Sequence, residues 1–284
     1  MKKHQTLAAL CALAAGGAAA NPFECLIQPN QTVDLRSSTE GIIEKVLVQR
    51  GDRVRAGQVL VQLESAAEAS AVELARHRAE AGGRLETAQN RLDYANKKLA
   101  RSAQLQAQNF MSAQARDEAD AEKRISESEL REARESRQQA VYEHRHAQDL
   151  LNRRVLRSPF DGLVLDRMLN PGDLAESGTG RKPILRLVQV EPLRVEVVLP
   201  LAAWGRLKAK TQADVVPEGL GGRYPATVTV VDSVFDTASG TFGVRLQLPN
   251  AQGRIPAGIR CQVDFPALRG LAPRLSPARG STLD

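Results

Sequence analysis

The sequence predicts an elongated, multidomain α+β chain. A β-sandwich is split into two halves, a long antiparallel α-helical coiled-coil hairpin is inserted between them, and a small β-barrel follows. Three observations predict this architecture. A short motif occurs twice, a proline-free stretch with leucine and alanine at helical spacing separates the copies, and short alternating runs divided by turn residues fill the last third. The 284 residues, 42% of them hydrophobic, are enough for roughly two folded domains.

The first twenty residues have the pattern of an export signal. Two lysines precede an apolar run at residues 7–15, and Ala20 supplies the small residue before a cleavage site. The run is shorter than the roughly 20 apolar residues that a bilayer span needs. A leucine stands before Cys11 where a lipoprotein signal has a small residue, so we expect no lipid anchor. The sequence therefore predicts an exported chain whose signal peptide, residues 1–20, is removed.

Two cysteines remain after that cleavage. Cys25 and Cys261 lie at opposite ends of the chain, each inside a strand-like run. In an oxidising compartment two cysteines often pair, and a disulfide would join the two ends of the chain. Two separate buried thiols are the alternative, because the sequence fixes no distance between them.

The repeat consists of residues 35–54 and 156–175, which align at one constant offset. The matching positions include four turn glycines: Gly41 with Gly162, and Gly51 with Gly172. Each copy reads as a strand, a glycine turn, a second strand and a Gly-Asp turn. Two such halves predict one pseudo-symmetric sandwich built from both.

The stretch between the halves, residues 66–151, predicts the hairpin. Hydrophobic residues recur every seven positions, as in a coiled coil. The rows expected to form its seam are Leu85, Leu92 and Leu99; Leu74, Ala81, Ala88 and Ala95; and, in the second arm, Ala119, Ser126, Ala133, Ala140 and Ala147. Because the two halves must meet, the insert must turn back, and we place the turn near residues 108–111. Gly82-Gly83 interrupts the first arm, and we expect a tolerated weak spot within one helix rather than a hinge.

The last third predicts five or more short strands in a small β-barrel, with a short helix over residues 201–208. The predicted segments are the signal peptide 1–20, an N-terminal strand 21–34 that joins the barrel or membrane-proximal end, the sandwich halves 35–65 and 152–190, the hairpin 66–151, the barrel 191–268 and a disordered tail 269–284.

Composition argues against several chemistries. Positive and negative charges are interleaved and the net charge is +6, so we expect no nucleic-acid partner. His144 and His146 are two apart on a helix and cannot chelate one metal together. The loop 178–182 lacks the spacing of a phosphate-binding loop. We therefore expect no catalytic residues, no metal and no cofactor, and thus not an enzyme.

The order of elements and the repeated motif resemble the periplasmic adaptor, or membrane fusion protein, family (HlyD-like) of bacterial tripartite efflux pumps. Residues 235–241 also look like the barrel of that family. The resemblance implies that the split sandwich is lipoyl-like, but no lysine at a tight turn offers a cofactor attachment site. Arg101, Leu105 and Ser112 fit the spacing by which many members contact a TolC-type outer-membrane channel at the hairpin tip. A helix N-cap is the alternative role for Ser112.

The resemblance implies a function for the whole chain. It predicts a non-enzymatic periplasmic adaptor between an inner-membrane transporter and a TolC-type channel. The chain would form a homo-oligomer, a hexameric ring or a trimer of dimers. The usual transporter is of the resistance-nodulation-division class; an ATP-driven export or type I secretion system is the alternative. We expect the additional membrane-proximal β-domain of larger members to be reduced or absent. A self-associating periplasmic coiled-coil scaffold is a competing interpretation.

Overall fold

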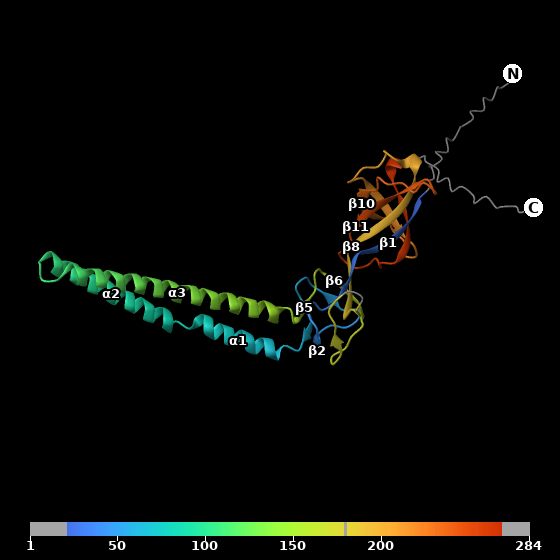
Figure 1. Ribbon diagram of the computed structural model, residues 1–284. Coiled ribbons are helices and arrows are strands. Elements are labelled where there is room, and N and C mark those ends of the chain that lie inside the picture. Colours follow the sequence, from blue (N-terminus) through green and yellow to red (C-terminus); the bar gives the residue numbers. More distant parts are fainter. Residues whose placement is uncertain (1–21, 179–180, 269–284) are drawn as a thin grey trace, which may run out of the picture. The chain divides into compact units, whose positions relative to one another are not determined.

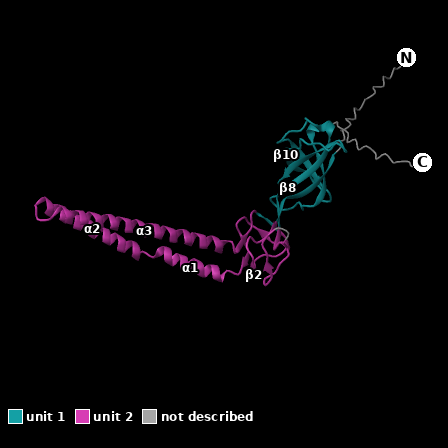
Figure 2. Cartoon of the chain, viewed as in Figure 1, with its two compact units in different colours: residues 1–33, 161–163, 187–284 teal, residues 34–160, 164–186 magenta. Residues whose placement is uncertain are grey.

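The computed structural model describes residues 22–178 and 181–268 (Figure 1). The chain forms two compact units (Figure 2). Unit 1 consists of residues 1–33, 161–163 and 187–284, and unit 2 of residues 34–160 and 164–186. The predicted fold class is confirmed: a split sandwich, a helical hairpin and a barrel are all present. The predicted signal peptide and tail lie outside the described residues.

The sandwich in unit 2 draws strands from both copies of the repeat. The first copy supplies β2 (Gly41–Val46), β3 (Arg53–Val54) and β4 (Val59–Leu63), and the second supplies β5 (Val155–Arg157), β6 (Gly162–Arg167) and β7 (Leu174–Ala175). Four of them form a sheet in the order β5-β4-β2-β7, so each half pairs with the other. Leu60, Val61 and Val164 are fully buried in this body.

The two copies also form equivalent turns. Gly51 and Gly172 share a φ of 92°, a left-handed conformation that glycine adopts without steric cost. Asp52 accepts a hydrogen bond from the backbone N–H three residues before it (2.7 Å), and Asp173 does the same (2.8 Å). Each turn bonds to a strand of the other copy: the Gly51 N–H donates to the Val164 carbonyl of β6 at 2.9 Å, and the Gly172 N–H donates to the Ile43 carbonyl of β2 at 2.8 Å. Gly41 and Gly162 are also equivalent, since they begin the strands β2 and β6.

The hairpin consists of α1 (Ala66–Glu80), α2 (Gly83–Ala107) and α3 (Ala113–Asn152), labelled in Figure 1. The first arm is not continuous. Ala81 has an extended ψ of 110°, and the helix begins again at Gly83. The expectation of a tolerated weak spot within one helix is therefore wrong. Each glycine costs a helix about 1 kcal/mol relative to alanine, and two in succession end it here.

Small side chains form the seam of the hairpin. Ala88, Ala95 and Ser102 of α2 are buried, as are Ala119, Ser126 and Leu130 of α3. The predicted row is wrong on α1, where Leu74 is 55% exposed and Val72 and Ala75 are buried instead. The break after Glu80 explains this difference, because it interrupts the helical spacing that would have joined Leu74 to the rows on α2.

The barrel in unit 1 has six strands. They are β1 (Phe23–Leu35), β8 (Leu185–Pro200), β9 (Gln212–Pro217), β10 (Tyr224–Val231), β11 (Thr241–Leu248) and β12 (Ile259–Asp264). Their order is β1-β12-β9-β10-β11-β8, and pairing of β1 with β8 closes the ring. Leu193, Val215 and Leu246 belong to its core.

Two 3₁₀ turns accompany these strands, η1 (Leu201–Ala203) and η2 (Pro266–Leu268). The helix expected over residues 201–208 is wrong beyond η1, since Pro200 precedes that turn and Gly205 has a φ of 78°. Within residues 22–178 and 181–268, every helix is too short or too polar to cross a membrane.

Cys25 and Cys261 are joined by a disulfide in the structure. They are direct partners in the antiparallel pairing of β1 with β12, and their Cα atoms lie 4.8 Å apart. The bond links positions 236 residues apart in sequence, so the first strand of the barrel is fixed covalently to the last.

Candidate functional site

The hairpin tip is a tight turn with a defined hydrogen-bond pattern. The N–H of Phe110 donates to the carbonyl of Leu105 (2.9 Å), and the N–H of Asn109 donates to the carbonyl of Gln106 (2.9 Å). Asn109 has a φ of 58°. These are the hydrogen bonds of a Schellman motif. In this motif a residue in the left-handed conformation follows the helix, and two backbone carbonyls of the last helical turn accept hydrogen bonds from the N–H groups beyond it. The tip is therefore a fixed structure.

Ser112 begins the returning helix. Its hydroxyl accepts the N–H of Ala115 at 3.3 Å, and the residue is exposed. This is the N-cap interaction that satisfies one of the free N–H groups at a helix start. The capping role weighed from the sequence is thus present, and it leaves the outer side of the hydroxyl at the surface of the tip.

Arg101 and Leu105 lie on α2, one turn apart on the same face. Arg101 is exposed, and its guanidinium makes no hydrogen bond or ion pair with another described residue. Leu105 is 39% exposed. The three residues singled out from the sequence therefore surround one turn, two on the last part of α2 and one at the start of α3.

Phe110 is the residue of the tip that the sequence interpretation missed. Its ring is 79% exposed, an unusual state for a large apolar side chain. In a Schellman motif the residue at this position commonly contacts the helix residue that stands at Leu105. The signal that could have identified it was an asparagine directly before an aromatic residue within the predicted turn at residues 108–111.

Two ion pairs join α2 to α3 below the tip. Nζ of Lys98 lies 2.5 Å from the Glu122 carboxylate, and Nη1 of Arg91 lies 3.2 Å from that of Glu129. The hydrogen bond that Lys98 donates to the Glu122 carboxylate raises the pKa of Lys98. All four side chains are largely exposed, so the pairs fix the register of the arms more than they stabilise them.

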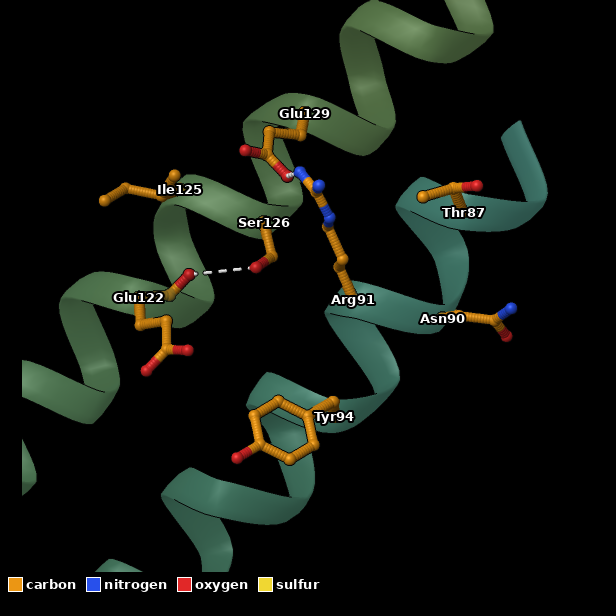
Figure 3. A pocket seen from close by; sticks show the side chains of 8 residues that line it. All are labelled: Thr87, Asn90, Arg91, Tyr94, Glu122, Ile125, Ser126 and Glu129. Carbon is orange, nitrogen blue, oxygen red and sulfur yellow. Dashed lines mark hydrogen bonds and ion pairs between the residues drawn. The ribbon is translucent and has the colours of Figure 1, made fainter. Parts of the chain in front are cut away.

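A shallow groove of about 540 Å³ lies between these arms, and Figure 3 shows Arg91 reaching across it to Glu129. Tyr94 and Ile125 line it and are 58% and 61% exposed. The other lining residues are Thr87, Asn90, Glu122 and Ser126. An open groove with two apolar side chains suits contact with another helix better than enclosure of a small molecule.

Arg154 fixes the base of the hairpin. It follows α3, and its Nε donates to Oε1 of Glu68 on the first turn of α1 at 2.9 Å, while Nη2 bonds the same oxygen. Nη1 donates to the carbonyl of Glu40 at 2.7 Å. A Cβ on Gly41 would lie 2.5 Å from that nitrogen, so the repeat glycine makes room for the guanidinium. The hydrogen bond from Arg154 lowers the pKa of Glu68.

The described residues contain no cluster of three or more histidine, cysteine, aspartate or glutamate side chains that could hold a metal ion. His144 and His146 lie on α3, half-buried and exposed respectively.

Comparison with known proteins shows to which domain family the chain is similar. The profile of the CzcB-like barrel-sandwich hybrid domain matches residues 31–180. The cobalt-zinc-cadmium resistance protein CzcB of Cupriavidus metallidurans is 24% identical over 243 residues, which cover 86% of this chain and 44% of that protein. The chain spans about half the length of the curated relatives it matches.

Solved structures share the fold. MacA from Actinobacillus actinomycetemcomitans superposes with a TM-score of 0.71 at 19% identity, covering 86% of this chain and 77% of the other. The membrane fusion protein Spr0693 from Streptococcus pneumoniae gives a TM-score of 0.60 at 18% identity, covering 86% and 97%.

Proposed function

The chain belongs to the CzcB-like barrel-sandwich hybrid domain family, and from this membership we propose that it is a periplasmic adaptor of an efflux system. In this role the hairpin docks by its tip onto a TolC-type outer-membrane channel, and the rest of the chain engages an inner-membrane transporter. The chain works by joining its partners and not by catalysis. An export signal at residues 1–20 would deliver it to the periplasm.

The observation that carries the proposal is the division of the hairpin into a buried seam and an exposed tip. Ala88 and Ala95 hold the arms together, whereas Arg101, Leu105 and Phe110 are exposed beside one rigid turn. An arginine next to apolar side chains suits a groove that offers both an apolar pocket and carbonyl or carboxylate acceptors. The fixed turn lowers the entropic cost of docking.

The proposal also includes the class of transporter. We favour a proton-driven transporter of the resistance-nodulation-division class, because it is the usual partner of the adaptor family that the sequence resembles, and an ATP-driven transporter is the alternative. Co-purification from membranes that contain one or the other class would distinguish them. A homo-oligomeric ring, hexameric or a trimer of dimers, would let several tips engage one channel.

Alanine variants of the tip test the adaptor role. Arg101→Ala, Leu105→Ala and Phe110→Ala should each weaken capture of the solubilised channel by about tenfold or more, as expected for anchors of an interface. Arg84→Ala and Leu74→Ala remove exposed side chains of the same types lower on the hairpin and should leave capture unchanged. All five should melt at the temperature of the unchanged chain. Normal capture by the tip variants would remove the tip assignment.

Self-association of hairpins is a second candidate, favoured by the exposed pair Tyr94 and Ile125 in the groove. A photo-reactive side chain placed at Ser112 separates the two roles. Capture of an outer-membrane protein at Ser112 supports the adaptor, and capture of a second copy of this chain alone supports the scaffold. The same probe at Ile125 reports whether the groove packs against another hairpin.

A further inference from the structure

One end of the barrel carries an exposed surface of apolar and basic side chains, to which the adaptor proposal assigns no residue-level contact. The last residue of β8, Pro200, pairs with Thr241 at the start of β11, and Val231 at the end of β10 pairs with Val244. The segment after β8 and the loop before β11 therefore lie at the same end. The N–H of Leu201 donates to the carbonyl of Gly240 at 3.0 Å and ties them together. We call residues 201–211 and 232–240 the barrel cap.

The cap is held firmly by packing. Ala203 and Leu207 are buried within the barrel core. The indole of Trp204 packs edge-on against Phe235 at 4.7 Å and Phe242 at 5.3 Å between ring centroids. The two phenylalanine rings thus fix the orientation of Trp204, which stays 42% exposed.

Large apolar side chains gather on the outside of the cap. Trp204 is 42% exposed, Leu201 is 50% exposed and Val234 is 81% exposed. Single exposed apolar residues are common on protein surfaces, but several at one place mark an interaction site.

Three basic side chains accompany them. Arg206, Lys208 and Lys210 are exposed, and none forms an ion pair with another residue in the described ranges. The acidic residues of the cap, Asp232 and Asp236, lie on the other segment. Hydrogen bonds from Ser239 and from the N–H of Ala238 lower the pKa of Asp236 and occupy its carboxylate. Residues 201–211 therefore present apolar and cationic groups together.

We propose that the barrel cap binds the surface of an anionic lipid bilayer. Tryptophan settles at the headgroup level, and nearby lysine and arginine attract anionic headgroups while their alkyl stems cover apolar surface. A protein partner is less well matched, because protein–protein interfaces are depleted in lysine, and this cap presents Lys208 and Lys210 beside Trp204. The proposal goes beyond the adaptor role and requires neither transporter nor channel.

The fluorescence of Trp204 provides a direct measurement, because it is the single tryptophan of the chain. The protein is purified from the periplasm of an expressing host and mixed with vesicles of equal parts phosphatidylglycerol and phosphatidylcholine. The emission should shift to the blue as the indole enters the headgroup region. Vesicles of phosphatidylcholine alone, or addition of salt, should reduce the shift, since the basic residues then lack an unscreened partner.

Variants assign the binding to the cap. The triple change Arg206→Gln, Lys208→Gln and Lys210→Gln should lower the partition coefficient by about a hundredfold, at about fivefold for each basic residue. A matched control removes the same number of positive charges from unit 2 through Arg50→Gln, Arg53→Gln and Arg55→Gln. This control should leave the partition coefficient unchanged. Leu201→Ser with Val234→Ser should weaken co-sedimentation, whereas Ile42→Ser with Leu47→Ser, which are 48% and 52% exposed in unit 2, should not.

Four outcomes would overturn the proposal. The first is a Trp204 emission that does not shift with anionic vesicles, and the second is an equal loss of vesicle binding in the matched control variants. The third is a blue shift of the Trp204 emission that grows with protein concentration in the absence of lipid. The last is a blue shift that occurs only with membranes that contain a transporter. The third would indicate a second copy on the cap, and the last a protein partner. Capture of the channel by the hairpin tip would be unaffected by each of them, so this proposal and the adaptor role fail separately.

Discussion

The guanidinium of Arg154 donates to the carboxylate of Glu68, and this ion pair joins the residue after α3 to the first turn of α1. Both side chains are about one-fifth exposed, so solvent screens the pair only in part. The two arms of the hairpin thereby leave the sandwich from one fixed point. Any force applied at the tip would reach the sandwich through this base.

Loss of that ion pair should destabilise the base of the hairpin. Glu68→Gln is expected to lower the free energy of unfolding by about 1 kcal/mol in chemical denaturation. The pH dependence has a definite sign. The pKa of Glu68 is lowered from 4.5 on folding, so its stabilisation is present above pH 4.5 and is lost as the pH falls through the folded pKa.

The control for this change is Glu73→Gln, which removes the exposed pair with Arg76 on the same helix. It should alter stability by a few tenths of a kcal/mol at most. If Glu68→Gln and the unchanged chain lost stability in parallel on acidification, Arg154 would not be acting through Glu68.

The left-handed conformation of Asn109 predicts which residues the tip accepts. Asn109→Gly should preserve the turn, because glycine adopts a φ of 58° at no steric cost. Asn109→Val should cost about 1–2 kcal/mol in the turn, because a β-branched residue is strongly disfavoured there. Capture of the channel is the readout: the glycine variant should bind normally and the valine variant weakly. Equal binding by both would show that the geometry of the turn is not required.

The bond between Cys25 and Cys261 should stabilise the barrel. Closure of so long a loop restricts the unfolded chain, and its removal is expected to cost about 3–5 kcal/mol. Melting with and without a reducing agent measures the effect. The double variant Cys25→Ser with Cys261→Ser should melt like the reduced chain and should not respond to the reducing agent. A double variant as stable as the oxidised chain would contradict the prediction.

Replacing both glycines at the break in the first arm should extend the helix. Gly82→Ala with Gly83→Ala should raise the far-ultraviolet helical signal, since neither added Cβ meets a neighbour within 4 Å and each alanine favours the helix by about 1 kcal/mol. A continuous helix would rotate the packed side of α1 relative to that of α2 and so disturb the packing of the hairpin. Channel capture should therefore fall even as the helical content rises. An unchanged helical signal would show that packing against α3, and not the glycines, sets the break.

The sequence identified most of the residues at the hairpin tip, but few of the contacts that hold the hairpin in place. The heptad pattern indicated where α2 and α3 would meet, and the resemblance to the adaptor family singled out Arg101, Leu105 and Ser112 on either side of the predicted turn. The sequence could not reveal the clamp formed by Arg154, because Glu40 and Glu68 are distant from it in sequence. The sequence interpretation also missed Phe110, whose importance depends on its exposure. Long-range contacts and exposure are properties of the packed chain, and a pattern of neighbours along the sequence contains neither.

The sequence by itself determined the repeat, the hairpin and the positions of the turns. Helical and strand periodicities are local, and glycines such as Gly51 and Gly172 mark the same backbone conformation wherever the motif occurs. Only the tertiary structure decided that Cys25 lies beside Cys261 and that Trp204 packs against Phe235 and Phe242. Both outcomes depend on which strands and loops close the barrel, because closure brings together groups that no local interaction connects.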